Sequence, residues 1–355
     1  MLLKKIGKVF LLALNILFVT ALFISYCSAF IPPDKWWFFS FFGLGFLYIY
    51  LINLLFIVFW LILKSKYFII SMVFCLVGFG FISRYIQLGG EKTKKGDLKV
   101  ISYNVKFFVG NGVKSSKTVA DSILKFLASE NPDLICLQEV RLKNSAVFNL
   151  DQIKARHSFV KHYQYASSST DLGSVTMTRF PVARMEEIRF KGTRNIAIFT
   201  DIVVGKDTIR VFNVHLQSYW IDPNKYSIIE SPMISESDDL REVKEVGLKV
   251  IKASMLRARQ ARVINEQIRN SPYPVIVCGD FNDTPASYTY RKTRGNLKDS
   301  FVESGKGFAW TYISQLPSFR IDYIMHSKEY RSYNYRQVNL KLSDHIPVTC
   351  DLVKR

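Results

Sequence analysis

At six positions after residue 97, a polar residue directly follows a run of apolar residues in the sequence. Strand ends hold side chains rigidly and leave them open to a cleft, so residues in such places can do chemistry. Each place alone has an ordinary structural explanation, such as a turn, a cap or a core histidine. Together they form a set with one chemical purpose. The motifs are Ser-Tyr-Asn104-Val, Leu-Gln-Glu139-Val, Asn-Val-His215-Leu, Gly-Asp280-Phe-Asn282-Asp, Arg-Ile-Asp322-Tyr and Ser-Asp344-His345-Ile.

The residue types in this set favour a hard divalent cation. Carboxylate and amide oxygens are the ligands of Mg²⁺ and Mn²⁺, whereas a zinc site more often shows cysteines or clustered histidines at short spacing. No Ser-His-Asp order or strained nucleophile turn is evident, so attack by water is favoured over a covalent intermediate. Hydrolysis of a phosphate ester fits, because a metal and cationic groups stabilise the extra charge of its transition state.

The ordered set of these residues resembles the endonuclease/exonuclease/phosphatase family over Val100 to Leu352. The resemblance implies an α/β fold, a four-layered sandwich of two mixed β-sheets flanked by helices, with the cleft at one end of the sheets. It implies that Glu139 is the main metal carboxylate for Mg²⁺ or Mn²⁺, with Asn104 beside it and Asp344 completing or supporting the site.

The same resemblance assigns the proton chemistry. His345, oriented by Asp322, would act at the scissile phosphate, and Asp280 would orient or deprotonate the attacking water. Asn282 would bind the phosphate and transition-state oxygens. His215 would donate to a phosphate oxygen or to the leaving group. Which group is acid and which is base stays open at this point.

Two arginines are weaker candidates for substrate contact. Arg141 follows Glu139 at the spacing that pancreatic-type deoxyribonucleases use for an arginine that reaches the nucleic acid, and an ordinary surface arginine is an equally good interpretation. Arg194, just before an expected strand, is a second candidate phosphate contact.

The sequence departs from its relatives in two places. The abasic-site endonuclease branch has an acid two residues after the first asparagine, where this chain has Lys106, which argues against a repair role. Deoxyribonuclease-like members pair the histidine of the His-Leu motif with an upstream glutamate. The corresponding stretch, Ser174 to Arg179, has no acid, so either Asp171 substitutes or His215 is oriented by other means.

Short apolar, β-branched runs predict the strands that carry these residues. They are Val100–Val105, Leu134–Leu137, Ser174–Thr178, Ile196–Val203, Ile209–Val214, Val275–Cys278, Ile321–Met325 and Val348–Leu352. A helix of about three turns is expected before Asn131-Pro132, with Val119, Ile123 and Leu127 on one stripe. A long amphipathic helix is expected over Val243–Ile268.

The first 87 residues have a membrane composition, with Asp34 as the one acid. A helix needs about 20 apolar residues to cross the hydrocarbon. Three runs are interpreted as retained spans, namely Val9–Phe30, Trp36–Leu63 and Tyr67–Ile86. A signal peptide is the alternative for the first, but two more apolar runs follow it.

The chain is therefore divided into a three-helix transmembrane anchor (1–87), a linker (88–99) and a catalytic domain (100–355). Lysines before the first span and between the second and third place the amino terminus inside and the catalytic domain on the extracytoplasmic side. Lys92, Lys94, Lys95 and Lys99 after the third span argue the other way.

The formal net charge of +19 favours an anionic partner, but it does not distinguish nucleic acid from lipid headgroups. The leading hypothesis is a membrane-anchored, nuclease-like phosphodiesterase. The first alternative is a phosphodiesterase or phosphatase for sphingomyelin- or inositol-phosphate-type substrates, which the anchor and the aromatic residues Tyr219 and Trp220 favour. The second alternative is a degenerate anion-binding module. No protein partner can be inferred.

Overall fold

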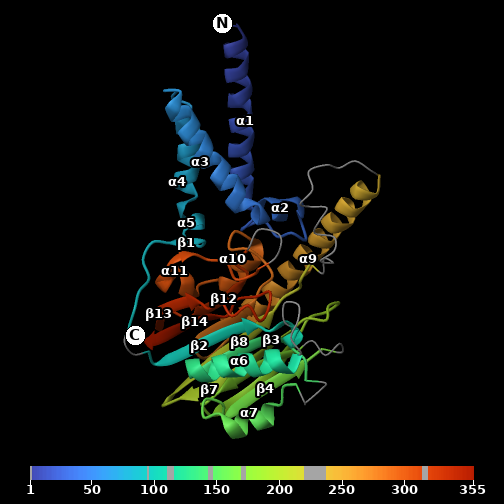
Figure 1. Ribbon diagram of the computed structural model, residues 1–355, viewed down its shortest axis with the longest axis vertical. Coiled ribbons are helices and arrows are strands. Elements are labelled where there is room, and N and C mark those ends of the chain that lie inside the picture. The colour runs from blue at the N-terminus through green and yellow to red at the C-terminus, as the bar shows by residue number, and fades with distance from the viewer. Residues whose placement is uncertain are drawn as a thin grey trace.

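The computed structural model describes residues 2–93, 96–109, 116–142, 147–168, 173–219, 237–313 and 319–355 (Figure 1). A helical unit at the amino terminus stands on a two-sheet α/β unit, and the long axis of the molecule runs through both. The helical unit is α1 (Leu2–Cys27), α2 (Phe38–Leu44), α3 (Phe46–Ile62), α4 (Phe68–Val77) and α5 (Phe79–Ile82).

Glycines interrupt the helical unit. Gly45 separates α2 from α3, which meet at 64°, and Gly78 separates α4 from α5. Glycine weakens a helix interior because it has the most backbone freedom to lose. By length and composition, the part of α1 over Ile6–Cys27 can cross a membrane, and the bent pair α2–α3 is a second candidate if it counts as one span.

The third predicted span, Tyr67 to Ile86, is wrong as one continuous helix. α4 has ten residues, and the chain after α5 leaves the helical unit. The guanidinium of Arg84 donates to the Pro285 carbonyl at 2.9 Å. Strand β1 (Ile86–Gln87) then pairs antiparallel with β11 (Gly307–Phe308). Polar and strand contacts thus tie this segment to the α/β unit.

Part of the predicted linker is bonded to the α/β unit as well. The Asn334 backbone N–H donates to the Glu91 carbonyl at 2.8 Å, and the Thr93 N–H donates to the Asn334 side chain at 3.1 Å. Asn334 lies in β13 (Tyr330–Gln337). The first long strand, β2, begins at Leu98.

Two six-stranded mixed sheets form the α/β unit, and each has one parallel pair at its centre. In one sheet the order is β10 (Lys298–Asp299), β12 (Asp322–His326), β9 (Val275–Asp280), β8 (Asp207–His215), β7 (Ile196–Val204) and β6 (Val182–Arg189). In the other it is β13, β14 (Val348–Lys354), β2 (Leu98–Asn104), β3 (Leu134–Val140), β5 (Gly173–Thr178) and β4 (His162–Ser167).

The parallel pairs determine where the polar strand ends meet. β2 and β3 are connected through α6 (Ser116–Glu130), and β8 and β9 through α9 (Ser237–Arg269). Parallel strands have their carboxyl ends at the same edge of a sheet. The register pairs Asn104 with Gln138 in one sheet and His215 with Asp280 in the other.

Three apolar layers hold the α/β unit together. Between the sheets, Val100 and Cys136 of one sheet pack with Ile276 and Cys278 of the other. Outside the first sheet lie α9 and α10 (Tyr288–Arg294), and outside the second lie α6 and α7 (Leu150–Arg156). The predicted four-layered sandwich is therefore confirmed, since each sheet is covered by helices on its outer face. The remaining short helices are η1 (Lys106–Phe108) and α11 (Ser300–Ser304).

Candidate active site

The strand ends of both sheets bring the predicted polar residues to one place. Asn104 ends β2, Glu139 lies at the end of β3, His215 ends β8, Asp280 ends β9 and Asp322 begins the neighbouring β12. Asp322 pairs with Asp280 across the antiparallel β9–β12 ladder. The cluster therefore consists of residues that are up to 218 positions apart in the sequence but share one edge of the sandwich.

Asn104 connects the two sheets through their acids. Its side-chain amide donates to Glu139 Oε1 at 3.1 Å and to Asp280 Oδ2 at 3.0 Å. Glu139 has a left-handed backbone, with φ of 54°, which costs energy and persists only where the surroundings hold it. Burial raises the pKa of the Glu139 carboxyl above its ordinary value. Two carboxylates thus converge on a single neutral donor.

His345 forms a buried pair with Asp322. Its Nδ1 lies 3.0 Å from Asp322 Oδ2, and its Nε2 lies 3.7 Å from Asp280 Oδ2. Burial alone would lower the pKa of His345, but the Asp322 and Asp280 carboxylates outweigh burial and raise that pKa to about 10. Thr311 helps to hold Asp322, whose backbone N–H donates to the threonine hydroxyl at 2.9 Å. The imidazole is therefore a cation at neutral pH.

Asp280 is the most central acid. Burial raises the pKa of its carboxyl to about 6, and the charge of Asp322 adds to this while His345 opposes it. The Asn282 backbone N–H donates to Asp280 Oδ1 at 2.8 Å, and the Asn282 side chain donates to Oδ2 at 3.2 Å. The preceding Gly279 has φ of 144°, and a Cβ there would lie 1.9 Å from the Val214 carbonyl oxygen. The Gly-Asp-Phe-Asn motif therefore needs its glycine.

His215 completes the cluster. Its Nε2 lies 3.4 Å from Glu139 Oε1 and 3.9 Å from Asp280 Oδ2, and within the described residues it has no hydrogen-bond partner. Burial lowers the pKa of His215, so this imidazole is neutral at pH 7. The acids nearest to His215 come from the cluster itself. The proposed substitute, Asp171, lies outside the described residues.

Asp344 pairs with a lysine beside the cluster. Its carboxylate pairs with Lys106 Nζ at 2.6 Å, the lysine that stands where relatives have an acid. The neighbouring Ser343 hydroxyl donates to the Asn104 carbonyl at 2.9 Å, which fixes this segment to the end of β2. Asp344 thus lies at the rim of the cluster, and its role as a metal ligand stays a prediction.

The two predicted arginines lie outside the cluster. Both are exposed, and the Arg141 guanidinium stacks 4.6 Å from the ring centre of Phe107. Arg194 precedes the buried Asn195, whose side chain donates to the Leu216 carbonyl at 3.0 Å, directly after His215. Contact of either arginine with a substrate stays a prediction.

Several supporting residues were missed by the sequence interpretation. Gln138 donates to Asn213 Oδ1 at 2.8 Å, and Asn213 donates to the Val175 carbonyl at 2.9 Å, so a buried polar contact joins the sheets directly beneath the cluster. Arg257 of α9 is fully buried and donates to Asp283 Oδ2 at 3.2 Å. Nothing in the sequence near these residues indicates their distant partners.

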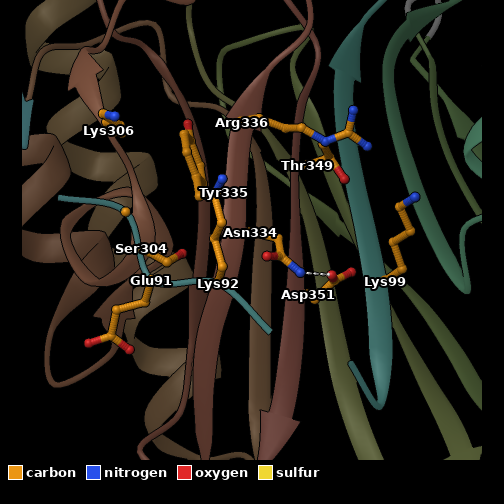
Figure 2. Close-up of a pocket in the computed structure, with 11 residues that line it drawn as sticks. Glu91, Lys92, Lys99, Ser304, Lys306, Asn334, Tyr335, Arg336, Thr349 and Asp351 are labelled. Carbon is orange, nitrogen blue, oxygen red and sulfur yellow. Dashed lines mark hydrogen bonds between the residues drawn. The ribbon is translucent and has the colours of Figure 1, made fainter. Parts of the chain in front are cut away.

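The described residues also line a cavity of about 420 Å³, but it lies away from the cluster (Figure 2). It contacts Lys99 at the start of β2, whereas Asn104 is at the end of that strand. Lys99 and Arg336 both pair with Glu130, so two of the cavity's cations already share an anionic partner. The polar cluster, rather than this cavity, is the candidate active site.

The donor set fits a divalent cation. Two buried carboxylates with raised pKa values face a neutral amide, and a cation at Glu139 would remove the cost of burying that charge. A second arrangement of potential ligands consists of Asp280, Asp322 and His345, whose ligand atoms lie within 4.8 Å of one another. Because His345 and Asp322 already satisfy each other, and the Asn104 side-chain oxygen accepts from the Lys106 N–H at 3.0 Å, the Glu139 carboxylate is the better place for a cation.

Comparison with known proteins agrees with this geometry. The model of the Endonuclease/Exonuclease/phosphatase family matches residues 101–345, and that of a domain of unknown function matches residues 8–85. No curated protein matches the sequence.

Solved structures share the fold of the α/β unit. An endonuclease/exonuclease/phosphatase from Beutenbergia cavernae is 17% identical, with a TM-score of 0.51 over 73% of this chain and 72% of that chain. The human Nocturnin catalytic domain with a bound sulfate anion is 17% identical, with a TM-score of 0.51 over 73% and 94%. Truncated Caenorhabditis elegans TDP2 is 15% identical, with a TM-score of 0.50 over 72% and 97%. Together with the family match over most of the α/β unit, these findings show that the chain belongs to the endonuclease/exonuclease/phosphatase family.

Proposed function

We propose that the protein is a membrane-anchored phosphodiesterase that depends on Mg²⁺ or Mn²⁺ and uses a water molecule as the nucleophile. The observation that carries this proposal is the convergence of Glu139 and Asp280 on the Asn104 amide, with His215 and His345 on either side of Asp280. A single buried acid would be an ordinary structural feature. No ordinary structural role explains why two acids and two histidines from both sheets gather at one edge of the sandwich.

The pKa shifts and hydrogen bonds support the following roles. Asp280, ionised above about pH 6, accepts a proton from the attacking water, and Asn282 holds the orientation of that carboxylate. His345 is a cation that donates to a phosphate oxygen, and Asp322 keeps it charged and oriented. Neutral His215 donates to the phosphate or to the leaving oxygen. A cation held by Glu139, beside Asn104, would neutralise charge on the phosphoryl oxygens.

The membrane anchor is supported by the inverted polarity of the helical unit. Most of the exposed side chains of its helices are apolar, for example Leu17, Leu55 and Val77. Its interior contains a closed polar network, in which Asn15 donates to Ser71 at 2.6 Å and Ser71 donates to Asn53 at 3.1 Å. Buried polar and exposed apolar side chains are the arrangement expected in lipid.

The same network favours a retained α1 over a cleaved signal sequence. Trp60 of α3 donates to Asn15 Oδ1 at 2.9 Å, and the Asn53 side chain donates to the Phe18 carbonyl at 3.0 Å. Removal of α1 would leave Ser71, Asn53 and Trp60 without these partners. We therefore propose a retained membrane unit with one or two full spans in place of three. With the amino terminus inside, one span would place the catalytic unit on the extracytoplasmic side, whereas two spans would place it inside.

A lipid phosphoester is the second candidate substrate, and the anchor is the observation that favours it. Of the two aromatic residues that favoured a lipid substrate, Tyr219 supports that substrate less than the sequence suggested. The Tyr219 ring lies 4.3 Å from the guanidinium of buried Arg257, so it is committed to an internal contact. Trp220 lies outside the described residues. A degenerate anion-binding module is disfavoured, because the acids and both histidines are present and converge.

A substrate panel tests the proposal. The full-length protein in detergent is assayed with Mg²⁺ or Mn²⁺ on DNA, RNA, sphingomyelin and inositol phosphates, beside an Asp280→Asn variant. An Asp207→Asn variant, which changes an exposed acid far from the cluster, is the matched control. We expect phosphodiester hydrolysis by the wild type and the control, with DNA or RNA cleaved, and loss in Asp280→Asn. Hydrolysis of lipid alone would favour the second candidate. Equal activity of all three proteins would refute the site.

A further inference from the structure

The loop between β9 and α10, residues 281–287, belongs both to the active site and to the contact between the two units. Its first residues support Asp280 through Asn282. Its next residues bond to the helical unit. The Thr284 hydroxyl donates to the Gly43 carbonyl at 3.1 Å, Arg84 donates to the Pro285 carbonyl at 2.9 Å, and the Ser28 hydroxyl donates to the Ala286 carbonyl at 2.9 Å.

This contact is closely packed. Ser28, Gly43, Thr284 and Ala286 are all buried. A Cβ on Gly43 would lie 2.5 Å from Ser28 Oγ and 3.6 Å from the Ala286 carbonyl oxygen. Contacts below about 3 Å force a shift, so even one methyl group at Gly43 would disturb the hydroxyl that holds the loop. The helical unit therefore fits the loop closely rather than lying beside it.

The opposite side of the same loop is fixed by α9. Arg257 donates to Asp283 Oδ2 at 3.2 Å and to the Gln217 carbonyl at 2.8 Å, so one side chain joins the loop after β9 to the loop after β8. α9 is itself tied to the helical unit, because Arg262 donates to both carboxylate oxygens of Asp34, at 3.0 and 2.6 Å. The loop is thus held between α9 and the helical unit.

The backbone of the loop needs such support. Asn282 has φ of 52°, a left-handed conformation that asparagine adopts more readily than most residues with a side chain but that is still less favourable than a right-handed one. A strained conformation persists only when surrounding contacts determine it. If the contacts relaxed, the Asn282 N–H would move away from Asp280, and catalytic geometry is sensitive to shifts of about 1 Å.

We propose that the helical unit is a positioning part of the active site, acting on Asp280 and Asn282 through the contacts of Ser28, Gly43 and Arg84 with residues 284–286. This rests on the proposed phosphodiesterase function and goes beyond anchoring. The family model begins at residue 101, so the contacts come from a segment outside the family domain. Ser28, Gly43 and Arg84 are positioning residues, since they act through the loop.

The test compares two glycines of the helical unit in the full-length protein in detergent. Gly43→Ala adds the clashing methyl group, whereas Gly80→Ala adds one where nothing lies within 4 Å. With bis(p-nitrophenyl) phosphate and Mg²⁺, we expect kcat of Gly43→Ala to fall roughly tenfold with KM within about twofold. Gly80→Ala should keep the kcat of the wild type. Hydrogen exchange of residues 281–287 should rise only in Gly43→Ala.

Three further variants keep the result decisive if Gly43→Ala folds poorly. Ser28→Ala removes the bond to Ala286 and should lower kcat in the same direction. Asp34→Arg should also lower kcat, and the double variant Asp34→Arg/Arg262→Asp should restore it, which would assign the loss to this ion pair; the melting temperature of each variant separates a loss of stability from a loss of positioning. Wild-type kcat and exchange in Gly43→Ala and Ser28→Ala would overturn the proposal. An inactive wild type would overturn the phosphodiesterase function instead, while loop exchange would still decide the coupling.

Discussion

The helical unit and the α/β unit use buried polar residues in opposite ways. In the helical unit, the network of Asn15, Asn53 and Ser71 is closed, because each side chain has a partner inside the bundle. In the α/β unit, the cluster at the strand edge is open, because His215 Nε2 has no hydrogen-bond partner among the described residues and two acids have raised pKa values. A closed network stabilises, and an open one is arranged to receive a ligand.

The proposed membrane location of the helical unit would explain the difference. Polar groups in lipid must find partners within the protein, so a membrane bundle turns them inward. A domain in water keeps its apolar residues inside, as the layer around Cys136 and Cys278 shows, and gathers its acids where a substrate can reach them. Substitutions in the two networks should therefore affect different properties.

The largest effect is expected at the open cluster. Asp280→Asn should lower kcat by roughly 10²- to 10⁴-fold, because the general base is lost. The melting temperature of the α/β unit should stay the same or rise, since the variant removes a carboxylate that is costly to bury. Kinetics and thermal unfolding of the same sample check both parts. A large fall in melting temperature would mean that Asp280 is structural.

The buried polar contact that joins the two sheets should behave differently. Gln138→Leu leaves the buried Asn213 side chain without its donor, at a cost of about 1–3 kcal/mol in the free energy of unfolding. Denaturant titration measures this cost, with Gln152→Leu on the exposed face of α7 as the control. We expect kcat to change little compared with its fall in Asp280→Asn. A stable variant with no activity would place Gln138 in the chemistry instead.

The pH dependence follows from Asp280. Its pKa is raised to about 6, so the carboxylate is ionised and active above that pH and becomes protonated as the pH falls through it. His345, with a pKa raised to about 10, stays a cation over the same range. We expect kcat/KM to fall about tenfold for each pH unit below 6. A profile that is flat between pH 5 and 7 would exclude Asp280 as the base.

The smallest effect is expected in the closed network of the helical unit. Asn53→Leu removes the partner of Ser71, and such bonds contribute about 0.6 kcal/mol on average in membrane bundles. Unfolding in mild detergent should show this loss, with Thr20→Leu on the exposed side of α1 as the control. Catalysis should be unchanged, unless the helical unit separates from residues 284–286.

Strands with continuous apolar runs could be predicted from the sequence, and the edge strands could not. β4, β6 and β13 each lie at a sheet edge, and none was predicted. β6 is exposed at most of its positions, so it has no apolar run to reveal it. An edge strand is recognised through its neighbour, which is a long-range contact.

The residues of the cluster could be predicted because each is recognised from its immediate neighbours in the sequence. Each of Asn104, Glu139, His215 and Asp280 directly follows an apolar strand, and the shared edge of parallel strands brings them together. The partners of these residues were not predictable. Lys106 pairs with Asp344, and Arg257 pairs with Asp283, so each pair joins distant segments. The prediction of a third membrane span was wrong because Arg84, near its end, bonds to the α/β unit.

Binding of Mn²⁺ to Glu139→Gln tests the central claim most directly, because it asks whether the open cluster receives a cation. Electron spin resonance of the full-length protein measures bound Mn²⁺, with Glu187→Gln on the exposed strand β6 as the control. The account predicts Mn²⁺ binding by the wild type and the control, a loss of affinity of at least roughly tenfold in Glu139→Gln, and no hydrolysis in EDTA. Equal Mn²⁺ affinity in all three proteins, or full activity in EDTA, would contradict it.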